Sequence, residues 1–298
     1  MNDPQTLPFP YGVNQFTTLP WSFEDDVRNY VRLGVEAIEL CEVKLDDVRR
    51  DEQLALLADS GLTVSSVQPK VRTVVASAGQ PEPKAREDRL ADIERSIRQL
   101  APSAPGAVFV TNTGPPPGNG NITAAIAQTV EDHRRLAAVA ADCGVRIALE
   151  PLNPVSMNQE TAIWTFRQAL HVVSEVGRDE LGICVDLWNL WQDGDLETDL
   201  AEAPDRVFLL QVSDWRTPRH GPAQRGHRRD PDRPVAARRP RHRLPRALCA
   251  GDLQPGRARL PLRHRPRGAG VRQPGRARAG LGDVSRRWAR GRLQASRW

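Results

Sequence analysis

Residues 145–153 read VRIALEPLN, an apolar run that ends in a glutamate and is followed at once by a proline. Such a run favours a buried strand, and the proline stops ladder pairing. Residues 181–189, LGICVDLWN, and 206–214, RVFLLQVSD, repeat the arrangement with an aspartate and a glutamine at the corresponding place. Successive strands that end in polar residues are typical of parallel sheets with a site at their C-terminal ends.

Four similar runs come earlier in the chain, at 11–18, 35–43, 62–69 and 106–114. Between the seven runs, apolar residues recur at three- and four-residue spacing, as in amphipathic helices. The helix-like stretches are 23–34, 45–61, 83–101, 121–144 and 158–177. Strict alternation of strand and helix predicts a parallel sheet, either an open doubly wound sheet or a closed (β/α)8 barrel.

Two features favour the barrel. No GxGxxG or Walker sequence follows the first strand, and the glycines of TGPPPGNGN at 113–121 stand among prolines, as in a long loop. Polar residues instead collect where the strands end, as they do around a barrel's active site. They are Asn14, Glu39, Gln68, Asn112, Glu150, Asp186 and Gln211. Because a barrel has eight strands, we predict a (β/α)8 barrel, class α/β, whose eighth strand is missing.

The composition changes abruptly near residue 219. Residues 219–298 contain 23 Arg and four Asp but no Lys, Glu, Ile, Phe or Tyr, whereas residues 1–218 hold 19 Lys and Arg against 33 Asp and Glu. An Arg-, Pro- and Gly-rich composition does not readily build a core. We therefore expect a barrel of seven strands in residues 1–218 and a disordered or irregular segment in residues 219–298.

Two interpretations of residues 219–298 stay open. A basic tail would bind nucleic acid non-specifically through its charge. Alternatively, a base gained or lost near codons 219–226 shifted the reading frame of GC-rich DNA. Read in the shifted frame, Cys249–Pro255 permits ALEIFS, an eighth strand that carries a glutamate, with its codon straddling Gly251 and Asp252. A genuine tail should follow a finished barrel, so we favour the frameshift.

The three polar strand ends Glu150, Asp186 and Gln211 suggest a metal site. Oxygen ligands on three successive strands can converge on one divalent cation, most readily Mg²⁺ or Mn²⁺, although Co²⁺ or Zn²⁺ also fits. The plainer interpretation is that a carboxylate at a strand end caps a helix or bonds to a loop. Because three such residues stand at the same place on three successive strands, we favour the metal site.

The motifs ALEPLNP, CVDLWNLW and LLQVSDWR resemble the sugar phosphate isomerase/epimerase family with its xylose isomerase-like TIM barrel, over roughly residues 8–218. The resemblance implies a divalent metal held by Glu, Asp, His or Gln, and a second Glu. Glu150, Asp186 and Gln211 match the first three positions. It also implies proton transfer next to a sugar carbonyl, with Glu150 as one member of the acid–base pair.

The same resemblance implies a sugar or sugar-like polyol as substrate. Asn189 stands where many members of the family carry histidine. Arg216 matches a basic residue that contacts substrate oxygens, and a surface ion pair explains it equally well. The residues expected to contact the substrate are Asn14, Glu39, Gln68, Asn153, Trp188, Asn189 and Arg216.

Without a fourth ligand, we expect the activity to be impaired in this chain. The alternatives are a dehydratase on the same barrel, a damaged barrel without activity, and a barrel with a nucleic-acid-binding tail. Cys41, Cys143, Cys184 and Cys249 lack CxxC spacing and suggest structural thiols. No signal peptide or membrane-spanning run is visible, so we expect a cytoplasmic protein with no membrane partner, and a homo-oligomer stays open.

Overall fold

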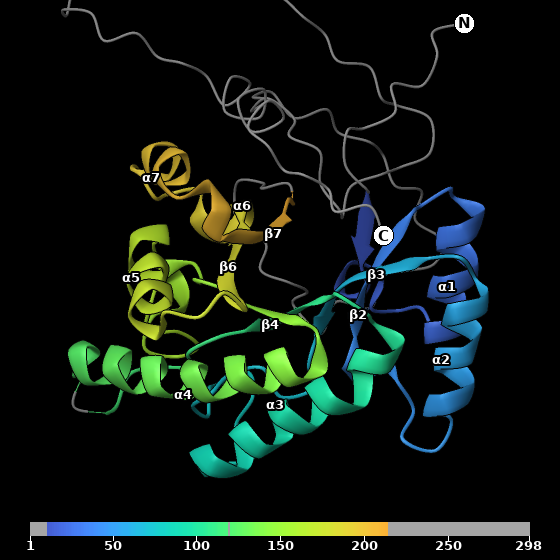
Figure 1. Cartoon of the computed structure of the whole chain (residues 1–298), viewed down its shortest axis with the longest axis horizontal. Coiled ribbons are helices and arrows are strands. Elements are labelled where there is room, and N and C mark those ends of the chain that lie inside the picture. Colours follow the sequence, from blue (N-terminus) through green and yellow to red (C-terminus); the bar gives the residue numbers. More distant parts are fainter. Residues whose placement is uncertain (1–10, 119, 214–298) are drawn as a thin grey trace, which may run out of the picture.

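The computed structural model of the chain describes residues 11–118 and 120–213 (Figure 1). Its strands form one parallel sheet in which each strand pairs with the next along the sequence. The strands are β1 (Gly12–Asn14), β2 (Ala37–Cys41), β3 (Thr63–Gln68), β4 (Val108–Thr111), β5 (Arg146–Leu149), β6 (Leu181–Asp186) and β7 (Val207–Gln211). The helices are α1 (Phe23–Arg32), α2 (Arg50–Asp59), α3 (Arg86–Leu100), α4 (Ile122–Cys143), α5 (Phe166–Val176), α6 (Leu187–Leu190) and α7 (Leu196–Glu202).

The sheet is curled, and the helices α1 to α5 follow one another around its outside (Figure 1). This arrangement confirms the predicted α/β barrel for seven of its strands. Within the described sheet, β1 and β7 are the two edge strands. The predicted eighth strand and the boundary at residue 219 both concern residues that lie outside the described ranges.

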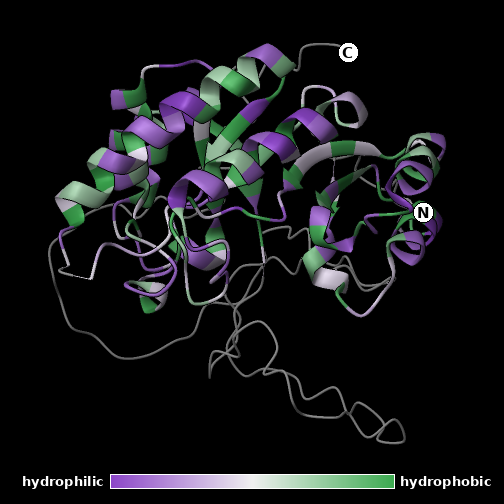
Figure 2. Cartoon of the chain, turned by 90° about the horizontal axis from the view of Figure 1, so that it is seen from below, coloured by the Kyte–Doolittle hydropathy of each residue, from purple (hydrophilic) through white to green (hydrophobic). Residues whose placement is uncertain are grey.

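Apolar side chains pack on both faces of the sheet. The larger core lies between sheet and helices, and on β5 it contains Ile147 and Leu149. A smaller cluster inside the curl contains Ala148 and Cys184, against which Phe208 packs. Side chains alternate between the two faces of a sheet along a strand. Glu150, two residues after Ala148, therefore lies on the same inner face. Figure 2 shows that the helices carry both hydrophobic and hydrophilic residues, as helices between a core and solvent do.

Local signals set the helix ends. Asn121 caps α4 by accepting a hydrogen bond from the Ala124 backbone N–H at 3.0 Å, and the helix ends at Gly144, whose φ of 67° suits glycine. The predicted helix start at residue 158 is wrong. Thr165 forms a capping box with Gln168, so that α5 begins only at Phe166.

Two short helices, α6 and α7, were not predicted, because four and seven residues carry too little periodicity. Three 3-10 turns near the C-terminal ends of strands also matter for the site: η1 (Gln15–Thr18), η2 (Glu42–Lys44) and η4 (Pro154–Ser156). In the described part of the chain, no helix is long and apolar enough to cross a membrane.

Candidate active site

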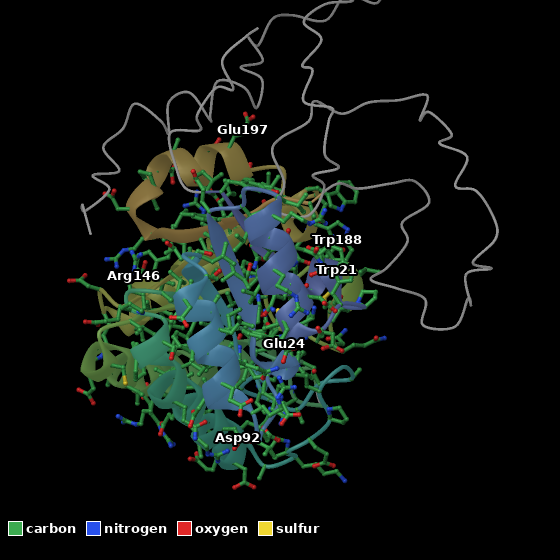
Figure 3. The ribbon with its side chains drawn as sticks, turned by 90° about the vertical axis from the view of Figure 1, so that its right-hand side faces the viewer. Trp21, Glu24, Asp92, Arg146, Trp188 and Glu197 are labelled. Atoms are coloured by element: carbon green, nitrogen blue, oxygen red, sulfur yellow. The ribbon has the colours of Figure 1, made fainter. Side chains whose placement is uncertain are left out.

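A ring of polar side chains lies at the C-terminal end of the curled sheet, which we call the mouth. β1, β3, β6 and β7 end on a polar residue, Glu39 lies two residues before the end of β2, and a polar residue directly follows β4 and β5. In Figure 3, Trp21 and Trp188, which follow the mouth ends of β1 and β6, lie on the side opposite Arg146, which begins β5. The ring comprises Asn14, Glu39, Gln68, Asn112, Glu150, Asp186 and Gln211.

Glu150 is held at the mouth by two amides. The Asn189 Nδ2 donates to its Oε1 at 2.8 Å, and the Asn112 Nδ2 donates to its Oε2 at 3.2 Å. The side chain is only 6% exposed, and burial raises the pKa of Glu150 above its ordinary value. The result is an oriented carboxylate whose affinity for a proton is increased.

Asp186 shares the Asn189 amide with Glu150. The Asn189 Nδ2 donates to Asp186 Oδ2 at 2.9 Å, while Asp186 Oδ1 accepts from the Trp188 backbone N–H at 2.8 Å and caps α6. Burial, and then the nearby charge of Glu150, raise the pKa of Asp186. Asp186 therefore does cap a helix, and it also faces a second carboxylate across one amide group.

Glu39 accepts two hydrogen bonds at a single oxygen. The Gln68 Nε2 donates to Glu39 Oε1 at 2.8 Å, and the Gln211 Nε2 donates to the same atom at 2.7 Å. Burial raises the pKa of Glu39 to about 7, and the charge of Glu150 contributes in the same direction. The structure thus brings Glu39, Gln68 and Gln211 together beside the Glu150 carboxylate.

The remaining expected substrate residues lie around this group. Asn14 accepts from the Phe16 backbone N–H at 2.8 Å and so caps η1. Asn153 is buried, and its backbone N–H donates to Asn189 Oδ1 at 3.1 Å, which orients the Asn189 amide toward the carboxylates. Trp188 is half-buried at the start of α6. Arg216 lies outside the described residues.

The donor set can be compared with the needs of a divalent cation. Glu150, Asp186 and Gln211 offer oxygen atoms, which suit a hard cation. Glu150 and Glu39 both raise the pKa of Asp186, and a cation among these carboxylates would relieve that repulsion. The chemistry fits, but the set is incomplete: among the described residues, no three His, Cys, Asp or Glu side chains form a group that could hold a metal ion.

Arg72, in the loop after β3, was missed in the sequence. The centre of its guanidinium lies 5.3 Å from the centroid of the Phe16 ring, and its charge lowers the pKa of Glu150, against the larger effect of burial. No strand or helix period marks the sequence VRTVV at 71–75. The one available signal was a lone arginine after a strand end, which is common on protein surfaces.

A cavity of about 440 Å³ lies elsewhere, between α2, α3 and the loops after β2 and β3. Its charged groups already pair with each other: Arg50 contacts Glu42 at 3.2 Å, and Lys70 contacts Asp47 at 3.4 Å. None of the residues of the polar ring lines this cavity. We therefore assign the candidate chemistry to the mouth.

A family model described as the xylose isomerase-like TIM barrel matches residues 27–237. No curated protein matches the sequence. Among solved structures, protein SMc04130 from Sinorhizobium meliloti 1021 is 25% identical and superposes with a TM-score of 0.61, over 71% of this chain and 76% of that one.

Two other solved structures share the fold. The 3-keto-D-glucoside 4-epimerase YcjR from E. coli is 22% identical with a TM-score of 0.56, over 68% of this chain and 78% of its own. The IOLI protein, whose crystal structure contains a bound zinc atom, is 19% identical with a TM-score of 0.57, over 70% of this chain and 73% of its own. At these identities the likeness establishes the fold.

Proposed function

Because the chain belongs to the xylose isomerase-like TIM barrel family, we propose that its mouth is the site of a divalent-metal-dependent isomerase or epimerase. The substrate is a sugar or sugar-like polyol, and the reaction moves a proton between carbons next to its carbonyl group. The epimerase named among the similar folds, and the zinc bound by the IOLI protein, support this chemistry by analogy.

The proposal is carried by one observation: Glu150 and Asp186 share the single Asn189 amide group, at 2.8 and 2.9 Å. A neutral N–H₂ group between two carboxylates offsets little of their repulsion, whereas a cation offsets it directly. A purely structural strand end would need only one carboxylate and its helix cap. The pair therefore favours a site that handles cations and protons.

Glu150, Asp186 and Gln211 would hold the metal through oxygen atoms, which prefer Mn²⁺ or Mg²⁺ and also accept Co²⁺ or Zn²⁺. When bound, the metal polarises the carbonyl and hydroxyl oxygens of the substrate and so acidifies the adjacent C–H bond. Glu150, as one member of the acid–base pair, would take that proton, and the second glutamate, the other member, would return one.

Neighbouring residues keep Glu150 in position. Asn112 and Asn189 bind its two carboxylate oxygens, and Asn153 orients Asn189. We propose Asn14, Glu39, Gln68, Trp188 and Asn189 as contacts for substrate hydroxyl groups around the mouth, with Arg216 as a further contact. The small-molecule substrate is then enclosed by βα loops, as is usual for a barrel enzyme.

We further propose that residues 1–218 are the native barrel and that residues 219–298 are read out of frame. The second glutamate would then be absent from the protein, and the metal site would lack its fourth ligand. An open sheet leaves the edges of β1 and β7 unpaired, which lowers stability and invites aggregation. The activity of this chain is accordingly impaired.

The test is exchange of solvent deuterium into a panel of ketoses and inosose-like polyols with Mn²⁺ or Mg²⁺, followed by proton NMR. We expect exchange with the frame-restored chain, little with the present chain, and none with Glu150→Gln in the restored chain. Exchange that survives Glu150→Gln would overturn the role of Glu150. Loss of water from the substrate would favour a dehydratase, which begins with the same proton removal.

A non-enzymatic role for the chain leads to a different expectation about nucleic-acid binding by residues 219–298. If residues 219–298 were a functional basic tail, binding to nucleic acid would be tight and sequence-selective, and would weaken steeply with added salt. A frameshifted segment of the same charge binds weakly and without sequence preference. Gel-shift titration at several salt concentrations separates the two.

A further inference from the structure

Two hydrogen bonds hold the backbone of Arg72 beside the mouth. Its carbonyl oxygen accepts from the Asn112 backbone N–H at 2.7 Å, and its own N–H donates to Gln80 Oε1 at 3.1 Å. Thr73 forms a parallel bridge with Asn112, so that this stretch continues the pairing of β3 with β4 beyond the ends of the strands. Arg72 therefore starts from a defined point next to Asn112, which itself binds Glu150.

The side chain of Arg72 is directed toward the mouth. Its guanidinium lies over the Phe16 ring, at 5.3 Å, and Phe16 belongs to η1, which follows the mouth end of β1. Its charge acts on Glu150. The aromatic ring restricts the orientation of the planar guanidinium and leaves its edge free for hydrogen bonds. A fixed, half-buried cation thus lies within electrostatic reach of the candidate base.

Other cations in the neighbouring loops have carboxylate partners. Lys44 contacts Asp26 at 2.5 Å, and Lys70 contacts Asp47 at 3.4 Å. The Arg72 guanidinium makes neither a hydrogen bond nor an ion pair within residues 11–118 and 120–213. No described residue therefore competes with a ligand at the mouth for its five N–H donors.

We propose that Arg72 binds an anionic group of the substrate, a phosphate or a carboxylate, while the reacting carbons lie at Glu150. That the substrate is a sugar rests on the proposed function. The new inference is that this substrate carries a negative charge. A guanidinium matches the paired oxygens of a phosphate or carboxylate, and charge-assisted hydrogen bonds are about twice as strong as neutral ones. A neutral polyol would leave the positive charge uncompensated.

A second role for Arg72 would be to lower the pKa of Glu150 without touching the substrate. The two roles differ in their consequences. A countercharge affects neutral and anionic substrates alike, and Lys replaces Arg with little loss. A ligand for an oxyanion distinguishes between substrates by charge, and Lys replaces it poorly because the paired geometry is lost.

The experiment is calorimetric titration of the full chain with D-fructose, D-fructose 6-phosphate and D-fructuronate. We expect the wild-type chain to bind at least one anionic ligand roughly tenfold to hundredfold tighter than fructose. Arg72→Met, which keeps contact with Phe16, should abolish the preference, and Arg72→Lys should reduce it. The matched control is Arg98→Met, which removes an exposed arginine in the last turn of α3, away from the mouth, and should change nothing.

Each outcome decides the question. A preference for the phosphate or for the carboxylate identifies which anion the site takes. An unchanged preference in Arg72→Met, a wild-type preference for fructose, or no saturable binding of any of the three ligands overturns the proposal. If the chain binds the anionic ligand selectively but the frame-restored chain shows no deuterium exchange, the proposal that Arg72 binds an anion stands and the proposed isomerase activity is rejected. Thermal melting of each variant shows that loss of binding is not loss of fold.

Discussion

The Gln211 Nε2 donates to Glu39 Oε1 at 2.7 Å and so joins the last strand of the described sheet to the second, 172 residues earlier. Pairing between neighbouring strands does not account for this contact, because within the described sheet β7 pairs with β6 alone. The contact shows how far the sheet curls, since the mouth end of β7 reaches that of β2 through two side chains. It also ties a proposed metal ligand to a buried carboxyl group.

Glu39→Gln should stabilise the metal-free chain. A glutamine carbonyl can accept from Gln68 and Gln211 as the carboxylate does, and the substitution removes a buried negative charge near Glu150 and Asp186. We expect a gain of roughly 1–3 kcal/mol in the free energy of unfolding near neutral pH. Urea unfolding measures it. A loss of stability would mean that the carboxylates do not repel one another in the folded chain.

Asn189→Asp should have the opposite effect. The substitution places a third carboxylate between Glu150 and Asp186, where an N–H₂ group now donates to both. We expect a loss of several kcal/mol without metal, since like charges at hydrogen-bond distance repel strongly in a buried site. Melting with and without Mn²⁺ is the measurement. The metal should raise the melting temperature more in the variant than in the wild type, and an equal rise would count against a cation at this place.

His133 makes stability depend on pH. It is fully buried, its Nδ1–H donates to the Thr129 carbonyl at 2.9 Å, and burial lowers its pKa from 6.5 to about 4. The unfolded chain therefore binds a proton at a higher pH than the folded chain does. The contribution of His133 to stability is fully present above about pH 6.5 and is lost as the pH falls to about 4, by roughly 3 kcal/mol in all, whereas the raised pKa values of Glu39 and Asp186 act in the opposite direction.

Urea unfolding at about pH 7 and about pH 5 tests this dependence. His133→Asn keeps an N–H donor near Thr129 and removes only the His133 contribution, so between the two pH values its free energy of unfolding should fall less, or rise more, than that of the wild type. The matched control is His171→Asn on α5, because His171 is exposed and its substitution should leave the loss unchanged. If both variants retain the full pH dependence, another group is responsible.

Gly182→Ala should destabilise the inner cluster. A Cβ atom at Gly182 would overlap the Phe208 ring, which also carries the guanidinium of Arg146 at 4.7 Å from its centroid. The ring must shift to admit the new atom, and we expect a loss of about 1–3 kcal/mol. Gly194→Ala is the control, since nothing lies within 4 Å of a Cβ there. Equal losses in the two variants would contradict the packing of Phe208 on Gly182.

Much of the fold could be predicted because its strands are short buried runs that end in polar residues. All seven runs become strands, and Asn14, Asp186 and Gln211 each stand at a strand's last residue. The start of α5 could not be predicted, because the apolar residues at 158–165 continue the helical spacing and only the Thr165 capping box ends it. Periodicity reports which face is buried and says little about where a helix begins.

The site was predictable in part for the same reason. Strand ends place Glu39, Gln68 and Glu150 at one mouth, but the sequence does not show that Glu39 pairs with Gln211 or that Asn189 bridges two carboxylates. Those contacts depend on side-chain rotamers across distant strands. Arg72 was missed because its role depends on the Phe16 ring, which lies in a different loop.

The most direct test is calorimetric titration of Mn²⁺ into the present chain and into the chain with its reading frame restored after residue 218, once the source DNA has been resequenced across codons 210–255. We expect a base gained or lost near codon 219 and binding at least roughly hundredfold tighter in the restored chain, since loss of even an outer partner of a ligand costs about 10–100-fold. Asp186→Asn should weaken binding in the restored chain. Equal, tight binding by both chains would contradict the missing fourth ligand.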